Sequence, residues 1–151
     1  MGTKAFQMKK ALIREAKEWP AFADLIADDA IWDSSYSGQA RRRELLWFGE
    51  IVWSSDRAVL VGSTPNMREE EFNIRFGIEV NDHDVTQMDA DDKAEILLQE
   101  MEALVGDKRR FGIDGIVSLG VVPIGLGEGP GGADGGRAAF IAAQVNVRAR
   151  K

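Results

Sequence analysis

The sequence predicts an α+β fold in which a mainly antiparallel β-sheet carries N-terminal helices and one long helix packed on one face. Residues 72–80 alternate between apolar and polar side chains, which is the pattern of a strand with one buried face. Residues 4–18 and 91–105 instead repeat apolar side chains every three or four positions, as amphipathic helices do. A chain of 151 residues fits one domain, and we expect that domain to span residues 1–151.

The N-terminal helix is expected to end before Pro20, because the residue preceding a proline is pushed out of the helical conformation. Lys9 falls outside the apolar stripe of this helix, so we expect it on the solvent side. A second short helix is predicted to start at Pro20, with Phe22 on its buried face. Residues 33–43 are polar and irregular, which predicts a surface loop.

The middle of the chain predicts strands separated by turns. Residues 45–53 are aromatic and apolar, which favours a strand with a bulge at Gly49. Ser54–Asp56 is a turn signal, and Ala58–Val61 follows as a candidate short strand.

The second half predicts a helix followed by a strand pair. A polar link over residues 81–92 offers Asp89 or Asp91 as a helix cap, and Gly106 as a left-handed helix end. Residues 113–124 and 137–149 are β-rich. Between them, the glycine-rich segment from Gly125 to Gly136 is predicted to be a flexible loop, much longer than a tight hairpin needs.

Composition narrows the possible chemistry. The chain has no cysteine and one histidine, His83, which excludes disulfides, cysteine-ligated metals and a histidine-rich metal site within the chain. The net charge of −6 argues against nucleic acid as a ligand. No apolar run approaches the about 18 residues of a membrane span, and residues 1–10 do not form a signal peptide. We therefore expect a soluble intracellular chain without a cofactor or a metal.

Catalytic and nucleotide-binding interpretations are weak. The glycine-rich segment lacks the Gly-Lys-Ser/Thr end of a phosphate loop, and it precedes a strand rather than a helix. No Gly-x-Ser-x-Gly elbow places a nucleophile. His83 lies between two aspartates in a polar link, where an exposed side chain is the simpler interpretation.

Aromatic and arginine side chains indicate protein contacts instead, since Trp, Tyr and Arg dominate binding hot spots. Trp47 and the run Arg41, Arg42 and Arg43 are candidates. The run Glu69–Glu71 precedes a strand, and we expect a solvated flank there. A small sheet also has two edges, which are natural sites for pairing with a neighbouring chain.

The order of these features resembles that of the tail terminator proteins of long-tailed, siphovirus-type bacteriophages. The helix broken at Trp19-Pro20 is followed by an aromatic-rich strand containing Gly49 and by the charged, then alternating, strand from Glu69 to Val80. The helix from Asp91 to Val105 comes next, and the chain closes with a strand pair that ends in Gln144-Val-Asn-Val-Arg-Ala-Arg150. The likeness covers nearly the whole chain and is one of element order.

The resemblance implies a structural protein without enzymatic activity. It implies a homo-oligomer, a hexameric ring, that caps the finished tail tube and joins it to the filled head. The implied partners are the tail tube protein and a head–tail connector or stopper protein. The implied location is the tail of the virion at the head–tail junction, after assembly in the host cytoplasm. DNA would pass through the channel without specific binding, and an acidic chain suits that passage because like charges repel.

Two segments depart from the family pattern, the arginine run and the glycine-rich segment. We hypothesise that the glycine-rich segment and the charged flank before the alternating strand contact neighbouring chains. The candidate interface residues are therefore Arg41, Arg42, Arg43, Trp47, Arg68, Glu69, Glu70, Glu71, Gly127, Gly129 and Gly131.

Three other functions stay open at this point. One is a different head–tail connector component, a head-completion or stopper protein. Another is a small cytoplasmic enzyme that uses carboxylates and His83. The third is a monomeric binding module whose glycine-rich segment closes over a ligand.

Overall fold

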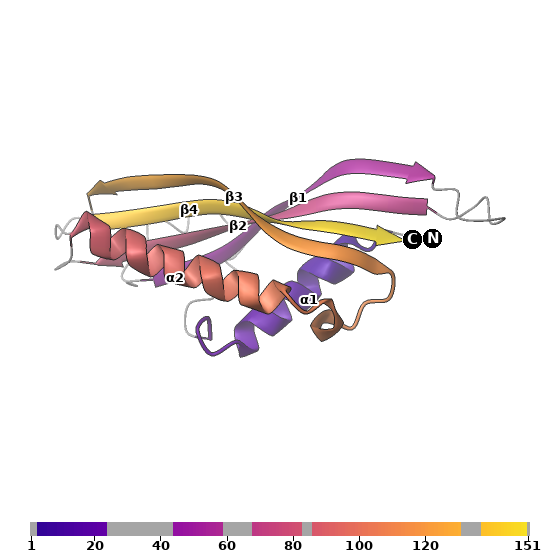
Figure 1. Cartoon of the computed structure of the whole chain (residues 1–151), viewed down its shortest axis with the longest axis horizontal. Helices are drawn as coiled ribbons and strands as arrows, with labels where there is room; N and C mark the ends of the chain where they lie inside the picture. The colour runs from indigo at the N-terminus through magenta and orange to yellow at the C-terminus, as the bar shows by residue number, and fades with distance from the viewer. Residues whose placement is uncertain (1–2, 24–43, 59–67, 83–85, 131–136, 151) are drawn as a thin grey trace.

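The computed structural model describes residues 3–23, 44–58, 68–82, 86–130 and 137–150 (Figure 1). These described residues form two α-helices, one short 3₁₀ helix and one four-stranded antiparallel sheet, which confirms the predicted α+β class. The elements in chain order are α1 (Ala5–Glu18), β1 (Glu44–Ala58), β2 (Arg68–Asp82), α2 (Gln87–Val105), η3 (Lys108–Phe111), β3 (Ile116–Pro130) and β4 (Arg137–Arg150).

The sheet has the strand order β1-β2-β4-β3. Its centre is the pairing of β2 with β4, which runs without a register shift from Glu69 opposite Arg150 to Asp82 opposite Arg137. Strands of this length extend for about 50 Å, whereas a usual strand of five or six residues extends for about 17–20 Å. The hairpins β1–β2 and β3–β4 form the two halves, and α2 carries the chain from β2 past β4 to β3 (Figure 1).

Both α-helices lie on the same side of the sheet, and the core fills the space between them and the strands (Figure 1). The alternating residues of β2 are buried on this side, as the period-two pattern predicted. Each such Phe, Ile or Val contributes about 1.5–3 kcal/mol when fully buried. The core includes Phe72, Ile74, Phe76, Ile78 and Val80 of β2, Val145 and Val147 of β4, Met8 and Leu12 of α1, and Leu97, Met101 and Leu104 of α2.

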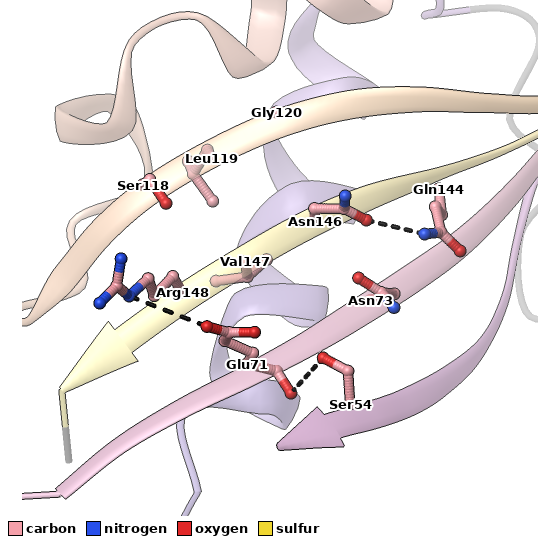
Figure 2. Close-up of a pocket in the computed structure, with 10 residues that line it drawn as sticks. All are labelled: Ser54, Glu71, Asn73, Ser118, Leu119, Gly120, Gln144, Asn146, Val147 and Arg148. Carbon is pink, nitrogen blue, oxygen red and sulfur yellow. Dashed lines mark hydrogen bonds and ion pairs between the residues drawn. The ribbon is translucent and has the colours of Figure 1, made fainter. Parts of the chain in front are cut away.

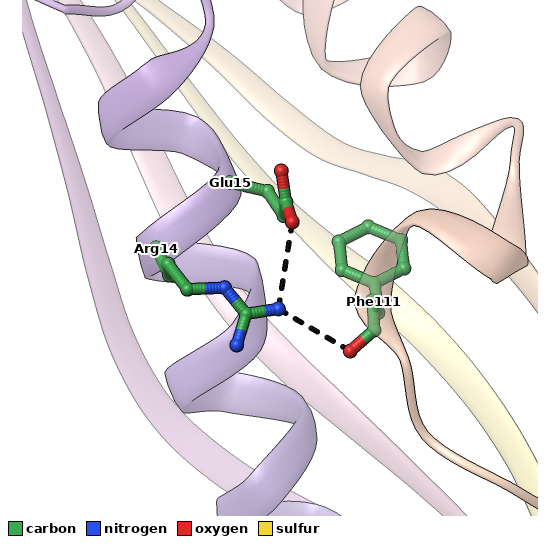
Figure 3. A network of polar contacts seen from close by, with 3 residues as sticks. All are labelled: Arg14, Glu15 and Phe111. Carbon is green, nitrogen blue, oxygen red and sulfur yellow. Dashed lines mark hydrogen bonds and ion pairs between the residues drawn. The ribbon is translucent and has the colours of Figure 1, made fainter.

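Polar contacts connect α1 and the residue that follows it to η3 and α2. Arg14 of α1 donates from Nη2 to the Phe111 carbonyl oxygen at 3.3 Å and to Glu15 at 3.4 Å (Figure 3). Trp19, just after α1, donates from Nε1 to Glu100 of α2 at 2.7 Å. The predicted end of α1 before Pro20 is confirmed, because Trp19 already has an extended ψ of 125°.

The bulge predicted at Gly49 is present, as the β1–β2 register shifts between Phe48 and Ile51. A bulge interrupts the ladder of backbone hydrogen bonds. Lys9 of α1 donates its Nζ to the Gly49 carbonyl oxygen and is only 1% exposed. The prediction that Lys9 faces solvent was therefore wrong, because a partly buried carbonyl at a bulge needs a donor and the long lysine stem reaches it.

Two predicted boundaries in the middle of the chain were also wrong. Ser54–Asp56 does not turn, because β1 continues to Ala58 opposite the early residues of β2. Helix α2 starts earlier than expected, at Gln87, where Thr86 forms a capping box with Asp89. Asp89 thus occupies the third helical position and accepts from the Thr86 backbone at 3.3 Å.

Glycines mark a second set of differences. Gly106 follows α2 with a right-handed φ of −62°. The described glycines with positive φ are instead Gly112 at the end of η3, with φ of 66°, and Gly115, with φ of 87°. Strand β3 extends to Pro130, so the first half of the predicted glycine loop is a strand. Pairing with β4 supplies backbone hydrogen bonds that composition alone does not reveal.

The other predictions of local structure lie partly or wholly outside the described residues. Of the predicted second helix, residues 20–23 form turns, Phe22 is buried as expected, and the remainder is not described. The predicted loop over residues 33–43, the short strand beyond Ala58 and residues 131–136 also lie outside the described ranges.

Burial lowers the pKa of Lys9 from 10.5 to about 8. At a pH between the folded pKa of about 8 and the unfolded pKa of 10.5, the amine of Lys9 is more protonated in the unfolded chain than in the folded chain. The Lys9 contribution to the free energy of unfolding therefore rises with pH in this range. We expect Lys9→Met to remove this rise, as measured by urea unfolding at a series of pH values. Lys10→Met, at the exposed neighbouring position, is the control. Equal pH dependence in wild type and Lys9→Met would contradict the buried position of this amine.

Candidate assembly surfaces

The face of the sheet opposite α1 and α2 carries no described helix (Figure 1). We call it the outer face. Its side chains come from the positions between the buried ones of each strand, so every strand contributes to it. Arg75 of β2 pairs there with Glu50 of β1 at 2.8 Å. The outer face is divided into an aromatic part and a polar part.

The aromatic part is built from three strands. Trp47 of β1 stacks on Phe140 of β4, with ring centroids 5.2 Å apart and an interplanar angle of 25°. Gly77 of β2 lies under the Trp47 ring, and a Cβ added there would be 2.2 Å from it. The ring can lie flat only because position 77 has no side chain. We call Trp47 and Phe140 the aromatic pair.

The polar part is a hollow of about 530 Å³ at the other end of the outer face (Figure 2). Gln144 donates from Nε2 to Asn146 Oδ1 at 2.8 Å. Arg148 pairs with Glu69 and lies 3.9 Å from Glu71. The lining includes amides, hydroxyls and this ion-pair group, but neither histidine nor cysteine, so it resembles a hydrogen-bonding surface more than a nucleophilic centre.

Two residues of the run Glu69–Glu71 are buried and do not form the solvated flank that the sequence predicted, whereas the side chain of Glu71 is 38% exposed. Glu70 is fully buried on the helix side, where its carboxylate accepts from the Lys4 backbone and, at 2.7 Å, from Thr3 Oγ1. A carboxylate at the start of α1 is favourable because that end of a helix carries partial positive charge. Glu69 is 3% exposed and pairs with Arg148. The prediction failed because β2 starts at Arg68, so these residues are inside the sheet.

Strand β3 forms one edge of the sheet and bears exposed apolar side chains. Val122, Ile124 and Leu126 are 40%, 54% and 53% exposed. No residue from 116 to 127 is charged. An uncharged, apolar edge is the kind that pairs with other chains unless something covers it. We call residues 116–127 the β3 edge.

An apolar hollow of about 350 Å³ lies between the β3 edge and α2. Leu98 of α2 and Ile141 of β4 contribute to it, together with Ile124 and Leu126. Asp91 and Glu95 of α2 add carboxylates to the same lining. The nearby Glu128 has its pKa raised, chiefly by a hydrogen bond with Asp91 and by the charge of that residue. The hollow thus combines an apolar lining with negative charge.

The structure places the predicted interface residues in different settings. Trp47 lies on the outer face, and Arg68 starts β2. Gly127 and Gly129 pair with Phe140 and Ala138 in the β3–β4 ladder. Outside the described residues lie Arg41, Arg42, Arg43, Gly131 and also His83.

Sequence reasoning missed Phe140 and the β3 edge. The alternation of β4 indicates the face of the sheet on which Phe140 lies. Its partner Trp47, however, comes from β1, which is not adjacent to β4. The exposure of Ile124 and Leu126 follows from the position of β3 at the edge. Strand order is not visible in local periodicity.

No group of three histidine, aspartate or glutamate side chains is placed to hold a metal ion among the described residues. No described helix has the length and apolarity needed to cross a membrane.

Comparison with known proteins does not assign a family. No protein-family model matches the chain, and no curated protein sequence matches it.

We expect Gly77→Ala to destabilise the fold by about 1–3 kcal/mol, because the new methyl group would push Trp47 off the sheet. Gly120→Ala is the matched control, since a Cβ at Gly120, also in a strand, meets no atom within 4 Å. That control should be neutral or slightly stabilising. Urea unfolding of both variants makes the comparison, and equal stabilities would contradict the flat packing of Trp47.

Proposed function

We propose that this chain is a structural tail terminator, which forms a hexameric ring that caps a phage tail tube and joins it to the head. One observation carries the proposal: the helices cover one face of the sheet and no described element covers the other face or the uncharged β3 edge. Large open surfaces of this kind serve contacts with other chains better than they serve catalysis. The order of elements supports the same proposal through its resemblance to the terminator family.

The aromatic pair is the anchor that we assign to the tail tube protein. Phe140 is 37% exposed, and its ring is held by the stack with Trp47. Rigid aromatic side chains contribute large contact area at low cost in conformational entropy, which is why they dominate binding hot spots. The connector or stopper protein on the head side would bind a different surface of the ring.

The charge of the chain supports a role around a DNA channel. The net charge of −6 repels a polyanion, so DNA can slide through without being held. No specific contact with DNA is proposed. The location that follows is the head–tail junction of the virion, after assembly in the host cytoplasm.

The decisive test mixes the purified chain with tail tubes that lack a terminator. We expect electron microscopy to show rings at one end of the tubes, and capped tubes to join filled heads. A double variant, Trp47→Ala with Phe140→Ala, should lose tube binding while remaining folded. Met88→Ala removes another exposed apolar side chain, from α2, and is the matched control.

Two outcomes would replace the proposal. Binding to the portal side of heads, with no binding to tubes, would favour a head-completion or stopper protein. A chain that ignores both tubes and heads would contradict a role in head–tail joining.

A further inference from the structure

The two edges of the sheet differ in their capacity to pair with another strand. Strands β1 and β3 each shift register twice against their neighbouring strand, so bulges do not distinguish the two edges, but β1 also carries Glu44 and Glu50. Charges of this kind protect an edge from pairing. The β3 edge has no charge and exposes Val122, Ile124 and Leu126. The β3 edge therefore lacks the charges that protect β1.

The two ends of the β3 edge carry opposite charge. Near its start lies η3, in which Lys108, Arg109 and Arg110 outnumber the nearby Asp107 and Asp114. Lys108 Nζ donates to the Val117 carbonyl oxygen at 3.4 Å, which fixes this positive end beside the strand.

The far end of the β3 edge is negative. Asp91 and Glu95 line the hollow beside Ile124 and Leu126. Glu128 adds a third carboxylate, with Arg137 as its basic neighbour. Among these described side chains, three carboxylates face one guanidinium, so they make this end negative.

We propose that the β3 edge of one chain pairs antiparallel with the β3 edge of a second copy, around a two-fold axis near Val122. An axis at that position brings the positive end of each strand beside the negative end of the other, and it does so twice. Two four-stranded sheets would then join into one continuous sheet. Ile124 and Leu126 of each copy would lose solvent contact in the joint.

Pairing of the β3 edge with β1 of a second copy is disfavoured by charge. Strand directions alternate across the sheet, so β1 of a copy in the same orientation would also run antiparallel to β3. If the two sheets joined without an offset along the strands, Glu44 at the start of β1 would lie beside Glu128 of the other copy. Like charges at that contact oppose the pairing, whereas the two-fold arrangement joins unlike charges.

The inference concerns the free chain and does not depend on the proposed terminator function. A two-fold contact uses the same surface on both copies and closes on itself, so it yields a dimer and not a ring. The outer face stays open in this dimer. A ring on a tail tube would have to use other surfaces or displace the β3 contact.

A single introduced cysteine tests the position of the axis, because the chain has no cysteine of its own. Residues directly opposite in an antiparallel pair are close enough for a disulfide. We expect cysteines introduced one at a time from Ser118 to Ile124 to cross-link under mild oxidation only at or next to Val122, because a residue four positions from the axis lies roughly 26 Å along the strand from its symmetry mate. Val52→Cys, on β1, is the matched control and should stay uncross-linked. No cross-link at any β3 position, or efficient cross-linking of Val52→Cys, would overturn the proposal.

A charge exchange tests the pairing of the two ends. Each of Lys108→Glu and Glu95→Lys should weaken dimerisation about tenfold, measured by sedimentation equilibrium, since each reversal affects two symmetry-related contacts. The double variant restores opposite charges across the axis and should recover most of the affinity. A wild-type chain that stays monomeric at high concentration, or a double variant no tighter than the single ones, would overturn the proposal.

Discussion

The unbroken pairing of β2 with β4 is the constraint on which the rest of the structure depends. These two strands stay in register from Glu69–Arg150 to Asp82–Arg137, and both place an alternating row of apolar side chains on the same face. A slip of one residue would move that row to the solvent side, so burial of the row fixes the register. The helices can then pack only on that face. Strands β1 and β3 add to either side of the central pair and become the edges.

This arrangement explains why the surfaces differ in kind. The face that the helices cover holds the core, whereas the outer face holds the aromatic pair and a hydrogen-bonded polar hollow. Of the two edges, β1 is interrupted by bulges, one of which places the Gly49 carbonyl against the buried Lys9. The β3 edge has shifts in its pairing with β4 as well, but it carries no charge to deter another strand. The structure therefore concentrates its capacity for contact on the outer face and the β3 edge.

Much of the fold could be predicted from local pattern, because the signals involved are local. The alternation of β2, the end of α1 before Pro20 and the bulge at Gly49 each follow from residues within a few positions of one another. The burial of Lys9 and Glu70 was not predictable in that way, because their partners lie 40 and 66 residues away in the sequence. The same reason applies to the candidate site: Trp47 was singled out as an aromatic residue, but its stack with Phe140 depends on strand order.

Hydrogen exchange, followed strand by strand at low and high protein concentration, tests most directly the central claim that β2 and β4 form the spine and β3 the open edge. In dilute solution we expect the slowest exchange in β2 and β4, because both are paired on two sides, and faster exchange in the edge strands. At high concentration, exchange should slow in residues 116–127 of β3 and stay unchanged in β1. Slowing in β1 instead, or exchange in β4 as fast as in the edges, would contradict the claim.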